Sequence, residues 1–210
     1  MSIRDKIRRG EAIPLPVSAL LQTASIIQRF GMWRRLRQPV TSVDARVISF
    51  GNLTAGGTGK TPAVLARAEK ELAAGRKVVI LTRGYGAAPV KEPLVHLPGE
   101  SIDARRFGDE PALLARRLPA LHIVRDRNRV RGAKAAIAAG CVTLILDDGF
   151  QAVTLARDEN ILLIDALQPF SNGYIIPRGI LREPIAAMNR ATSILITRCD
   201  QAEDIGAILT

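Results

Sequence analysis

The sequence reads Gly51-Asn52-Leu53-Thr54-Ala55-Gly56-Gly57-Thr58-Gly59-Lys60-Thr61-Pro62 directly after a short apolar run at residues 46–50. That run is rich in β-branched side chains, which is typical of a buried parallel strand. Residues 63–74 are rich in Ala, Leu, Glu, Lys and Arg and stop before Gly75, which predicts a helix. A strand, a glycine-rich turn that ends in Gly-Lys-Thr, and a helix are the parts of a phosphate-binding loop.

The chemistry of such a loop assigns a role to each part. Successive backbone N–H groups converge on an anion at a helix N-terminus, where the helix dipole already favours negative charge. Lys60 is expected to reach the β- and γ-phosphates of a nucleotide, and the Thr61 hydroxyl to ligate Mg²⁺. The candidate nucleotide-binding residues are Thr54, Ala55, Gly56, Gly57, Thr58, Gly59, Lys60 and Thr61. The strict pattern places glycine where Thr54 stands. A glycine-rich turn that binds nothing is the alternative, which the flanking strand and helix disfavour.

Composition limits the class of protein. With 210 residues, 47% of them hydrophobic, the chain suits one large domain, or one domain with an appendage, and can bury a core. Its two cysteines lack metal spacing, and with only two histidines we expect no zinc cluster. Aromatic residues make up 4% of the chain, which leaves little to stack on bases, so we expect no nucleic-acid partner.

The net charge of +10 is concentrated near the N-terminus, where residues 1–40 carry +6 of it. This asymmetry indicates an anionic partner, such as a membrane surface or a phosphorylated substrate. Residues 13–33 are too polar for a membrane span and lack a signal-peptide cleavage site. The face formed by Val17, Leu20, Leu21, Ala24 and Ile27 predicts an interfacial amphipathic helix instead. A helix packed on its own domain remains the alternative. The expected division is a membrane-associating segment at 1–42 and a core domain at 43–210.

From residue 46 onward, apolar strand-like runs alternate with helical stretches. Further strands are expected at 77–82, 121–124, 142–146, 161–164 and 194–197, helices at 109–117 and to about 139, and a loop at 87–107. This order predicts an α/β fold: a mostly parallel sheet with helices on both faces, like that of P-loop NTPases. Ligands bind such sheets beyond the carboxyl ends of the strands.

Several polar residues stand at those strand ends. Asp147 and Asp148 follow an apolar strand, where nucleotide kinases keep the carboxylate that holds Mg²⁺. A helix cap with a solvated neighbour is the alternative. Asp109, in Gly-Asp-Glu-Pro, is read from sequence alone as a helix cap. Arg83 is either a phosphate clamp or a surface arginine.

Five motifs in order carry a resemblance to a family. They are residues 51–62, Thr82-Arg-Gly-Tyr-Gly86, Gly108-Asp-Glu-Pro111, Leu146-Asp-Asp-Gly-Phe-Gln151 and residues 172–183. Together they resemble the tetraacyldisaccharide 4'-kinases, the lipid A 4'-kinases of Gram-negative bacteria, in which threonine at the position of Thr54 is usual. The resemblance implies a P-loop kinase that uses ATP and Mg²⁺ to phosphorylate the 4'-hydroxyl of a tetraacyldisaccharide 1-phosphate, the lipid A precursor.

The same resemblance implies roles for individual residues. Lys60 and Asp109 would be catalytic, with Asp109 as the base toward the sugar hydroxyl. Thr61, Asp147 and Asp148 would hold the metal, and the substrate contacts would be Arg83, Gln151 and Asn172. Because the acyl chains of the acceptor stay in the bilayer, the enzyme would work at the cytoplasmic face of the bacterial inner membrane as a peripheral or monotopic protein.

Two departures from the family pattern are visible. Ala152 stands where the family usually has histidine, and the family continues beyond the position of Thr210 as a smaller lobe with a histidine that supports the base. We therefore expect this chain to bind ATP but to transfer phosphate slowly or not at all. A P-loop regulatory GTP-binding protein is the rival function, but residues 197–200 do not match the base-reading Asn-Lys-x-Asp. An inactive membrane-surface protein is a third.

Overall fold

The computed structural model describes residues 5–7, 11, 14–88, 90–202 and 206. The chain divides into two compact units. The first unit comprises Met1–Gln38, Asn52–Gly59 and Ile161–Thr210, and the second comprises Pro39–Gly51 and Lys60–Asn160. The phosphate-binding loop therefore belongs to the first unit up to Gly59, and Lys60 and Thr61 belong to the second.

The second unit is built on parallel strands whose side chains are almost all buried. Its strands are β1 (Arg46–Gly51), β2 (Val78–Thr82), β3 (Leu94–His96), β4 (His122–Arg125) and β5 (Thr143–Leu146). They pair in the order β3-β4-β2-β5-β1, and every pair is parallel except β3–β4. The register places Leu144 opposite both Val47 and Val79, at the centre of the core. Buried runs of this kind are what a sheet covered on both faces requires.

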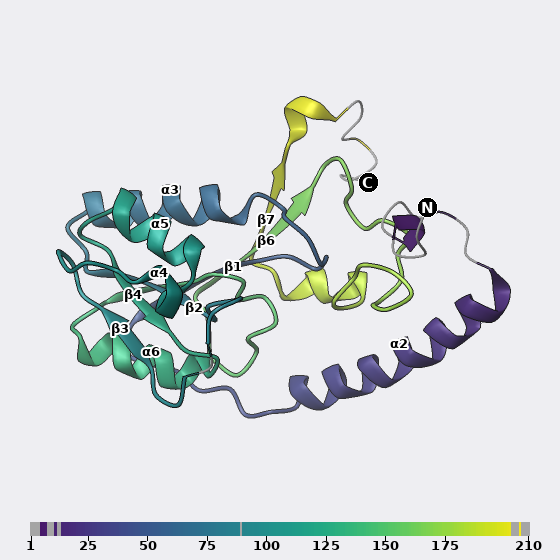
Figure 1. The fold of residues 1–210 in the computed structure, drawn as a ribbon, viewed down its shortest axis with the longest axis horizontal. Coiled ribbons are helices and arrows are strands. Elements are labelled where there is room, and N and C mark those ends of the chain that lie inside the picture. Colours follow the sequence, from purple (N-terminus) through teal and green to yellow (C-terminus); the bar gives the residue numbers. More distant parts are fainter. Residues whose placement is uncertain (1–4, 8–10, 12–13, 89, 203–205, 207–210) are drawn as a thin grey trace. The chain divides into compact units, whose positions relative to one another are not determined.

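Helices cover both faces of these strands (Figure 1). They are α3 (Lys60–Ala73), α4 (Ala104–Phe107), α5 (Asp109–Arg117) and α6 (Arg129–Ala138). In Figure 1, α3 and α5 lie above the sheet and α6 lies below it. The fold class predicted from the sequence is confirmed. The prediction of a plain loop at 87–107 is wrong, because β3 and α4 lie there. Their shortness explains the miss, since neither is long enough to show a hydrophobic period.

The first unit contains two parallel strands and the phosphate-binding loop. Most of β6 (Glu159–Asp165) pairs with β7 (Ser193–Thr197) in this unit, which also holds two short 3₁₀ helices at Ile185–Arg190 and Cys199–Gln201. Residues 53–55 run beside residues 180–182: the backbone N–H of Ala55 donates to Ile180 O at 2.7 Å, and that of Arg182 to Leu53 O at 2.6 Å. Thr54 forms an antiparallel bridge with Leu181. An extended pairing position suits threonine better than glycine.

Helix α2 (Leu15–Leu36) has an unusual distribution of side chains. Ser25 is 4% exposed, whereas Leu20 and Ile27 are 72% and 71% exposed. The Ser25 hydroxyl donates to Ile175 O at 2.9 Å, and Arg178 Nη1 donates to Gln22 Oε1 at 2.6 Å. The predicted helix is present, but its polar side contacts the rest of the first unit, because the loop at 175–178 offers backbone groups that need polar partners.

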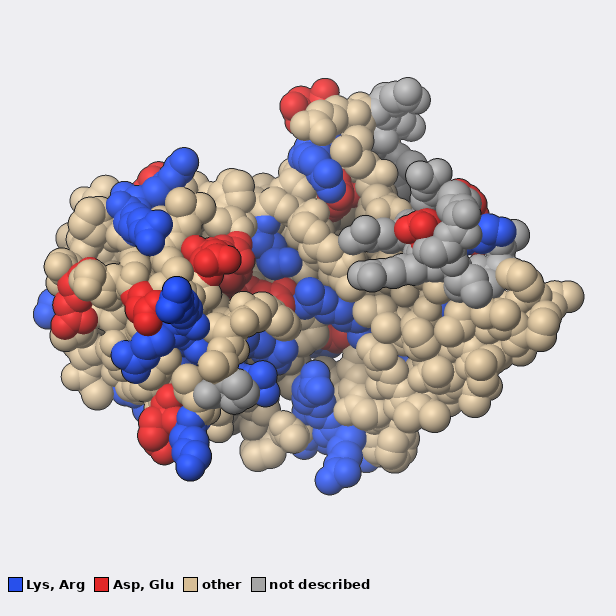
Figure 2. Space-filling view, in the orientation of Figure 1, with Lys and Arg blue, Asp and Glu red and all other residues tan. Residues whose placement is uncertain are grey.

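The outward side of α2 is correspondingly apolar. Large exposed hydrophobic residues along it are Leu15, Leu20, Ile26, Ile27, Phe30 and Trp33. In the space-filling view the surface over most of this helix carries no charged residue (Figure 2). Arg34 and Arg35 lie in its last turn. None of the described helices combines the length and the apolar character that crossing a bilayer requires. Arg4, Arg8 and Arg9, which contribute to the basic N-terminus, lie outside the described residues.

Candidate nucleotide and phosphate-transfer site

The glycine-rich loop lines a cavity within the first unit. Its volume is about 360 Å³, within the range of small-molecule sites. The lining residues are Thr54, Ala55, Gly56, Gly57, Thr58, Asp165, Gln168, Ile180 and Arg198. Asn52 is fully buried and its amide donates to Thr54 O at 2.8 Å, while Thr197 Oγ1 donates to Thr58 O at 3.1 Å. These bonds hold the loop in place from inside and from the end of β7.

The end of the glycine-rich loop and one residue of the cavity each have a feature that suits an anionic ligand. Gly59 has φ 71°, a left-handed conformation that glycine adopts without strain, and it leads directly into helix α3 at Lys60. The backbone N–H groups at that helix start are the ones that bind phosphate in such loops. Arg198 also lines the cavity, where its guanidinium forms an ion pair with Asp165.

In the second unit, Lys60 and Thr61 lie beside carboxylates. Lys60 Nζ is 3.5 Å from Asp148 Oδ1, and the Thr61 hydroxyl donates to the Glu110 carboxylate. The Tyr85 hydroxyl donates to Asp148 Oδ2 at 3.5 Å. The structure thus brings together three residues that the sequence predicted, Lys60, Thr61 and Asp148. It adds Glu110 and Tyr85, which the sequence did not single out although both stand inside quoted motifs.

Asp147 is a buried carboxyl group beside this cluster. Burial raises its pKa to about 6, and the nearby charges of Glu110 and Asp148 add to the rise, while Arg129 and Lys60 oppose the shift. Arg129 is itself almost fully buried and donates from Nη2 to Asp147 O at 2.7 Å. A buried carboxyl group whose pKa is raised by neighbouring carboxylates is typical of a site that gains a cation or a proton in use.

The turn after Asp148 is fixed by close packing. A Cβ on Gly149 would lie 2.5 Å from Ser49 Oγ, so only glycine fits against β1 there. Phe150 follows as a fully buried side chain, and the Gly149 N–H donates to Phe50 O at 2.8 Å. The sequence Asp-Asp-Gly-Phe therefore anchors the two carboxylates at the end of β5.

These residues offer the chemistry that Mg²⁺ prefers. Its ligands are hard oxygen atoms, and it is usually bound by one or two carboxylates together with water and substrate phosphates. Thr61, Glu110, Asp147 and Asp148 supply hydroxyl and carboxylate oxygens within one cluster. Among the described residues no group of three or more His, Cys, Asp or Glu side chains is arranged to hold a metal ion by itself. These oxygen ligands fit a Mg²⁺ ion whose remaining ligands are the phosphate oxygens of a nucleotide.

Asp109 lies at the first position of α5 with its side chain exposed. The residue that caps the helix is Gly108, with φ 100° and no side-chain hydrogen bond to the helix. The helix-cap interpretation of Asp109 is therefore wrong. The glycine takes the cap position because its backbone conformation is open to few other residues. The role of Asp109 as a base remains a prediction.

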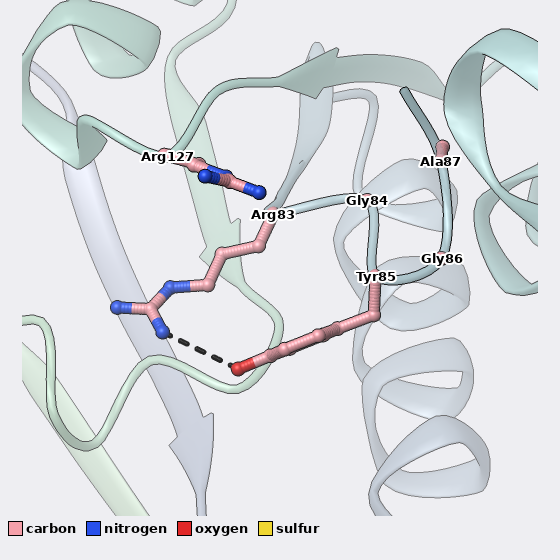
Figure 3. Close-up of a pocket in the computed structure, with 6 residues that line it drawn as sticks. All are labelled: Arg83, Gly84, Tyr85, Gly86, Ala87 and Arg127. Atoms are coloured by element: carbon pink, nitrogen blue, oxygen red, sulfur yellow. Dashed lines mark hydrogen bonds between the residues drawn. The ribbon is translucent and has the colours of Figure 1, made fainter. Parts of the chain in front are cut away.

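The three predicted substrate residues have different surroundings. Arg83 follows β2, and its Nη1 donates to the Tyr85 hydroxyl at 3.3 Å (Figure 3). Gln151 is half-buried in the turn after β5, also in the second unit. Asn172, in the first unit, donates from Nδ2 to Arg178 O at 3.0 Å and accepts from the Tyr174 N–H at 3.2 Å. Asn172 thus shapes the loop at 172–179, and its contact with substrate stays a prediction.

Buried strands, a glycine-rich loop that leads into α3 at Lys60, and carboxylates at the end of β5 define a P-loop nucleotide-binding protein. A family model described as LpxK, tetraacyldisaccharide-1-P 4'-kinase, matches residues 11–208. The chain belongs to this family, as the resemblance of its motifs predicted.

Individual relatives support the same family assignment. The tetraacyldisaccharide 4'-kinase of Anaeromyxobacter sp. (strain K) is 42% identical over 191 residues, which cover 90% of this chain and 50% of the relative. That of Jannaschia sp. (strain CCS1) is 44% identical over 188 residues, which cover 89% of this chain and 56% of the relative. The crystal structure of LpxK from Aquifex aeolicus in complex with ATP is 33% identical with a TM-score of 0.74, covering 89% of this chain and 58% of that one. The chain spans about half the length of the curated relatives named here.

Proposed function

We propose that this chain carries the nucleotide-binding core of a lipid A 4'-kinase. In the reaction, the 4'-hydroxyl oxygen of a tetraacyldisaccharide 1-phosphate attacks the γ-phosphorus of ATP. The bond to the β–γ bridging oxygen breaks, ADP leaves, and the hydroxyl proton passes to a base. The observation that carries the proposal is the cluster of Lys60, Thr61, Glu110 and Asp148, whose first member directly follows the glycine-rich loop in the chain.

Each residue of the cluster has a role that follows from its charge and place. Lys60 stabilises the negative charge that gathers on the β- and γ-phosphates as the bond breaks. The oxygens of Thr61, Asp147 and Asp148 would hold Mg²⁺, which neutralises phosphate charge when it is bound. Asp109, exposed at the start of α5, is the base that takes the proton of the acceptor hydroxyl. Arg83, Gln151 and Asn172 are the proposed substrate contacts.

The experiment that tests nucleotide binding compares two lysines of the same helix. Lys60→Ala removes a charge-assisted contact to phosphate, so Mg²⁺-ATP should bind about 10–100-fold more weakly in a calorimetric titration. Lys70→Ala, an exposed change in α3 with the same loss of charge, should bind like the parent. Equal affinities of the two variants would show that the glycine-rich loop does not use Lys60 to bind ATP.

We also propose that residues 1–42 hold the chain at the membrane surface, on the cytoplasmic face of the bacterial inner membrane, and that residues 43–210 form the catalytic core. The support is the apolar outward side of α2 with arginines in its last turn. Apolar burial at the lipid boundary and attraction of arginine to anionic lipids both favour such a position.

Substitutions on the outward side test this better than deletion of α2, because Gln22 and Ser25 also bind the loop at 175–178. Ile26→Glu combined with Phe30→Glu should abolish co-sedimentation with vesicles that contain anionic lipids. Leu113→Glu, at an exposed position of α5, introduces the same type of change away from α2 and should leave co-sedimentation intact. Binding of the parent should also weaken at high salt. Retention of vesicle binding by the doubly substituted chain would contradict the proposal.

A further inference from the structure

A cavity of about 340 Å³ lies in the second unit, at the carboxyl ends of β2 and β4 (Figure 3). Its lining residues are Arg83, Gly84, Tyr85, Gly86, Ala87 and Arg127. Arg83 comes from the turn after β2, and Arg127 from the turn after β4. Within the described part of the chain, the lining thus holds two guanidinium groups and no carboxylate, which is the composition of an anion site.

The wall of this cavity is fixed by a third arginine. Arg125 is 2% exposed, and it donates from Nη2 to the carbonyls of Ala87, at 3.0 Å, and Ala88, and from Nη1 to the carbonyl of Arg106. Gly84 has φ 65°, and a Cβ there would lie 2.0 Å from Arg125 Nε. The turn at 84–87 is therefore pinned to β4 and leaves room for no other residue at Gly84. A pre-formed wall lowers the entropic cost of binding a ligand.

The positive charge around the cavity is not balanced by the described residues that line it. The Nε atom of Arg83 is buried without a hydrogen-bond partner, and Arg127 is exposed. Burial lowers the pKa of Arg125, and the charge of Arg127 lowers it further. Arginines that repel one another in this way are stabilised by a bound anion.

We propose that Arg83 and Arg127 bind the phosphate group that the acceptor already carries, a sugar phosphate monoester. The inference rests on the proposed function, which supplies an acceptor of this kind. Guanidinium groups bind such a phosphate through paired N–H···O bonds. The Tyr85 hydroxyl bonds both Arg83 and Asp148, so the cavity adjoins the carboxylates of the phosphate-transfer cluster. Lys60, whose ammonium group lies 3.5 Å from Asp148, is the residue proposed above for the phosphates of the nucleotide.

The test uses the whole chain with its nucleotide site filled by Mg²⁺ and a non-hydrolysable ATP analogue, so that the glycine-rich loop is not free to bind the probe. N-acetylglucosamine 1-phosphate is then titrated calorimetrically, with N-acetylglucosamine as the uncharged control. Arg127→Ala should weaken binding of the phosphorylated probe at least about tenfold. Arg127→Lys should fall between that variant and the parent, because it keeps the charge but loses the paired donors. Arg117→Ala, an exposed arginine of α5, should bind like the parent.

The outcomes separate this inference from the proposed function. Failure of the ATP analogue to bind would count against nucleotide binding, and titration of the probe into the Lys60→Ala chain would still report on the cavity. Binding of the probe that is equal in the Arg127→Ala and Arg117→Ala chains would overturn the inference, as would absence of saturable binding to the parent. If Arg127→Ala weakened binding of the ATP analogue but not of the sugar phosphate, the cavity would be assigned to the nucleotide, and this result would also overturn the inference.

Discussion

In the second unit, arginines at the amino ends of the strands and arginines at the carboxyl ends meet different partners. At the amino ends, Glu71 is 1% exposed and accepts hydrogen bonds from Arg67 at 2.7 Å and Arg76 at 2.5 Å. Glu159 accepts from Arg67 and from Arg46, each at 2.6 Å. Burial raises the pKa of Glu71, but the hydrogen bonds from Arg67 and Arg76 outweigh it and leave the pKa lowered.

At the carboxyl ends the partners are mainly backbone carbonyls. Arg125 donates to Arg106, Ala87 and Ala88, and Arg129 donates to the carbonyls of Asp126 and Asp147. The comparison teaches that Arg46, Arg67 and Arg76 are neutralised by carboxylates, whereas Arg125 and Arg129 bond mainly to backbone carbonyls, which carry no formal charge to neutralise them. Changes at the amino ends should therefore act on stability, and changes at the carboxyl ends on binding and turnover.

The largest effect is expected at the carboxyl ends, from Asp109→Ala in a longer enzyme that carries these residues together with the family's smaller lobe, because this chain alone is expected to transfer phosphate slowly or not at all. General bases typically contribute about 10²–10⁴-fold, so phosphate transfer should fall by that factor. Transfer of labelled γ-phosphate to tetraacyldisaccharide 1-phosphate measures it. Affinity for Mg²⁺-ATP and the free energy of unfolding should change little, because the side chain is exposed and does not cap α5. Unchanged transfer would remove Asp109 from the mechanism.

The next largest effect is expected at the amino ends of the strands, on the stability of the fold. Glu71→Ala leaves Arg67 and Arg76 without their buried partner, and breaking such a network should lower the free energy of unfolding by about 3 kcal/mol. Urea denaturation measures the loss, with Glu69→Ala, an exposed change on the same helix, as the control. Mg²⁺-ATP affinity should remain that of the parent in both. A weaker affinity in the Glu71→Ala chain would show that the two ends are not independent.

The sequence was sufficient for every strand of the described residues except β3, and for the glycine-rich loop, because each has a local pattern. The apolar runs and Gly-Thr-Gly-Lys-Thr give strand, turn and helix without knowledge of distant contacts. The position of Asp148 at the end of a strand could be predicted for the same reason, and its role as a metal ligand stays a prediction.

The orientation of α2 and the partners of the charged residues could not be predicted. Ser25 is buried because of Ile175, which is distant in sequence. Glu110 joins the cluster through Thr61, and Arg127 lines a cavity together with the turn after β2, which Arg125 holds by hydrogen bonds. Each of these facts depends on a contact between separate elements, which the periodicity and spacing of residues in the sequence do not indicate.

A smaller effect is expected from pH through Asp147. Its pKa of about 6 lies above the ordinary 3.8, so the carboxylate is ionised at pH 7 and gains a proton as the pH falls through 6. Because Mg²⁺ requires the ionised form, Mg²⁺-ATP affinity should fall about tenfold between pH 7 and pH 5. The free energy of unfolding of the ligand-free chain should change in the opposite direction and rise as the pH falls. A carboxyl group whose pKa is raised in the folded state stabilises the fold most below pH 3.8, and this contribution is lost as the pH rises through 6.

Calorimetric titration across this range, and unfolding of the ligand-free chain, measure the two trends. Asp147→Asn should bind Mg²⁺-ATP more weakly at pH 7 and with a flatter dependence on pH. A pH profile identical to that of the parent would show that another group controls binding.

The smallest effect is expected from Arg46→Ala, and it decides whether pairing or burial gives the amino-end network its strength. The Arg46 side chain is 47% exposed, whereas that of Arg67 is 17% exposed. Exposed ion pairs usually contribute less than about 1 kcal/mol, and after the substitution Glu71 and Glu159 both keep Arg67. Arg67→Ala removes the shared partner of both carboxylates and should cost about 2 kcal/mol or more. Urea denaturation of the two variants at equal pH and salt compares them directly. Equal losses would mean that the number of arginines, rather than the burial of their bonds, sets the stability of this end.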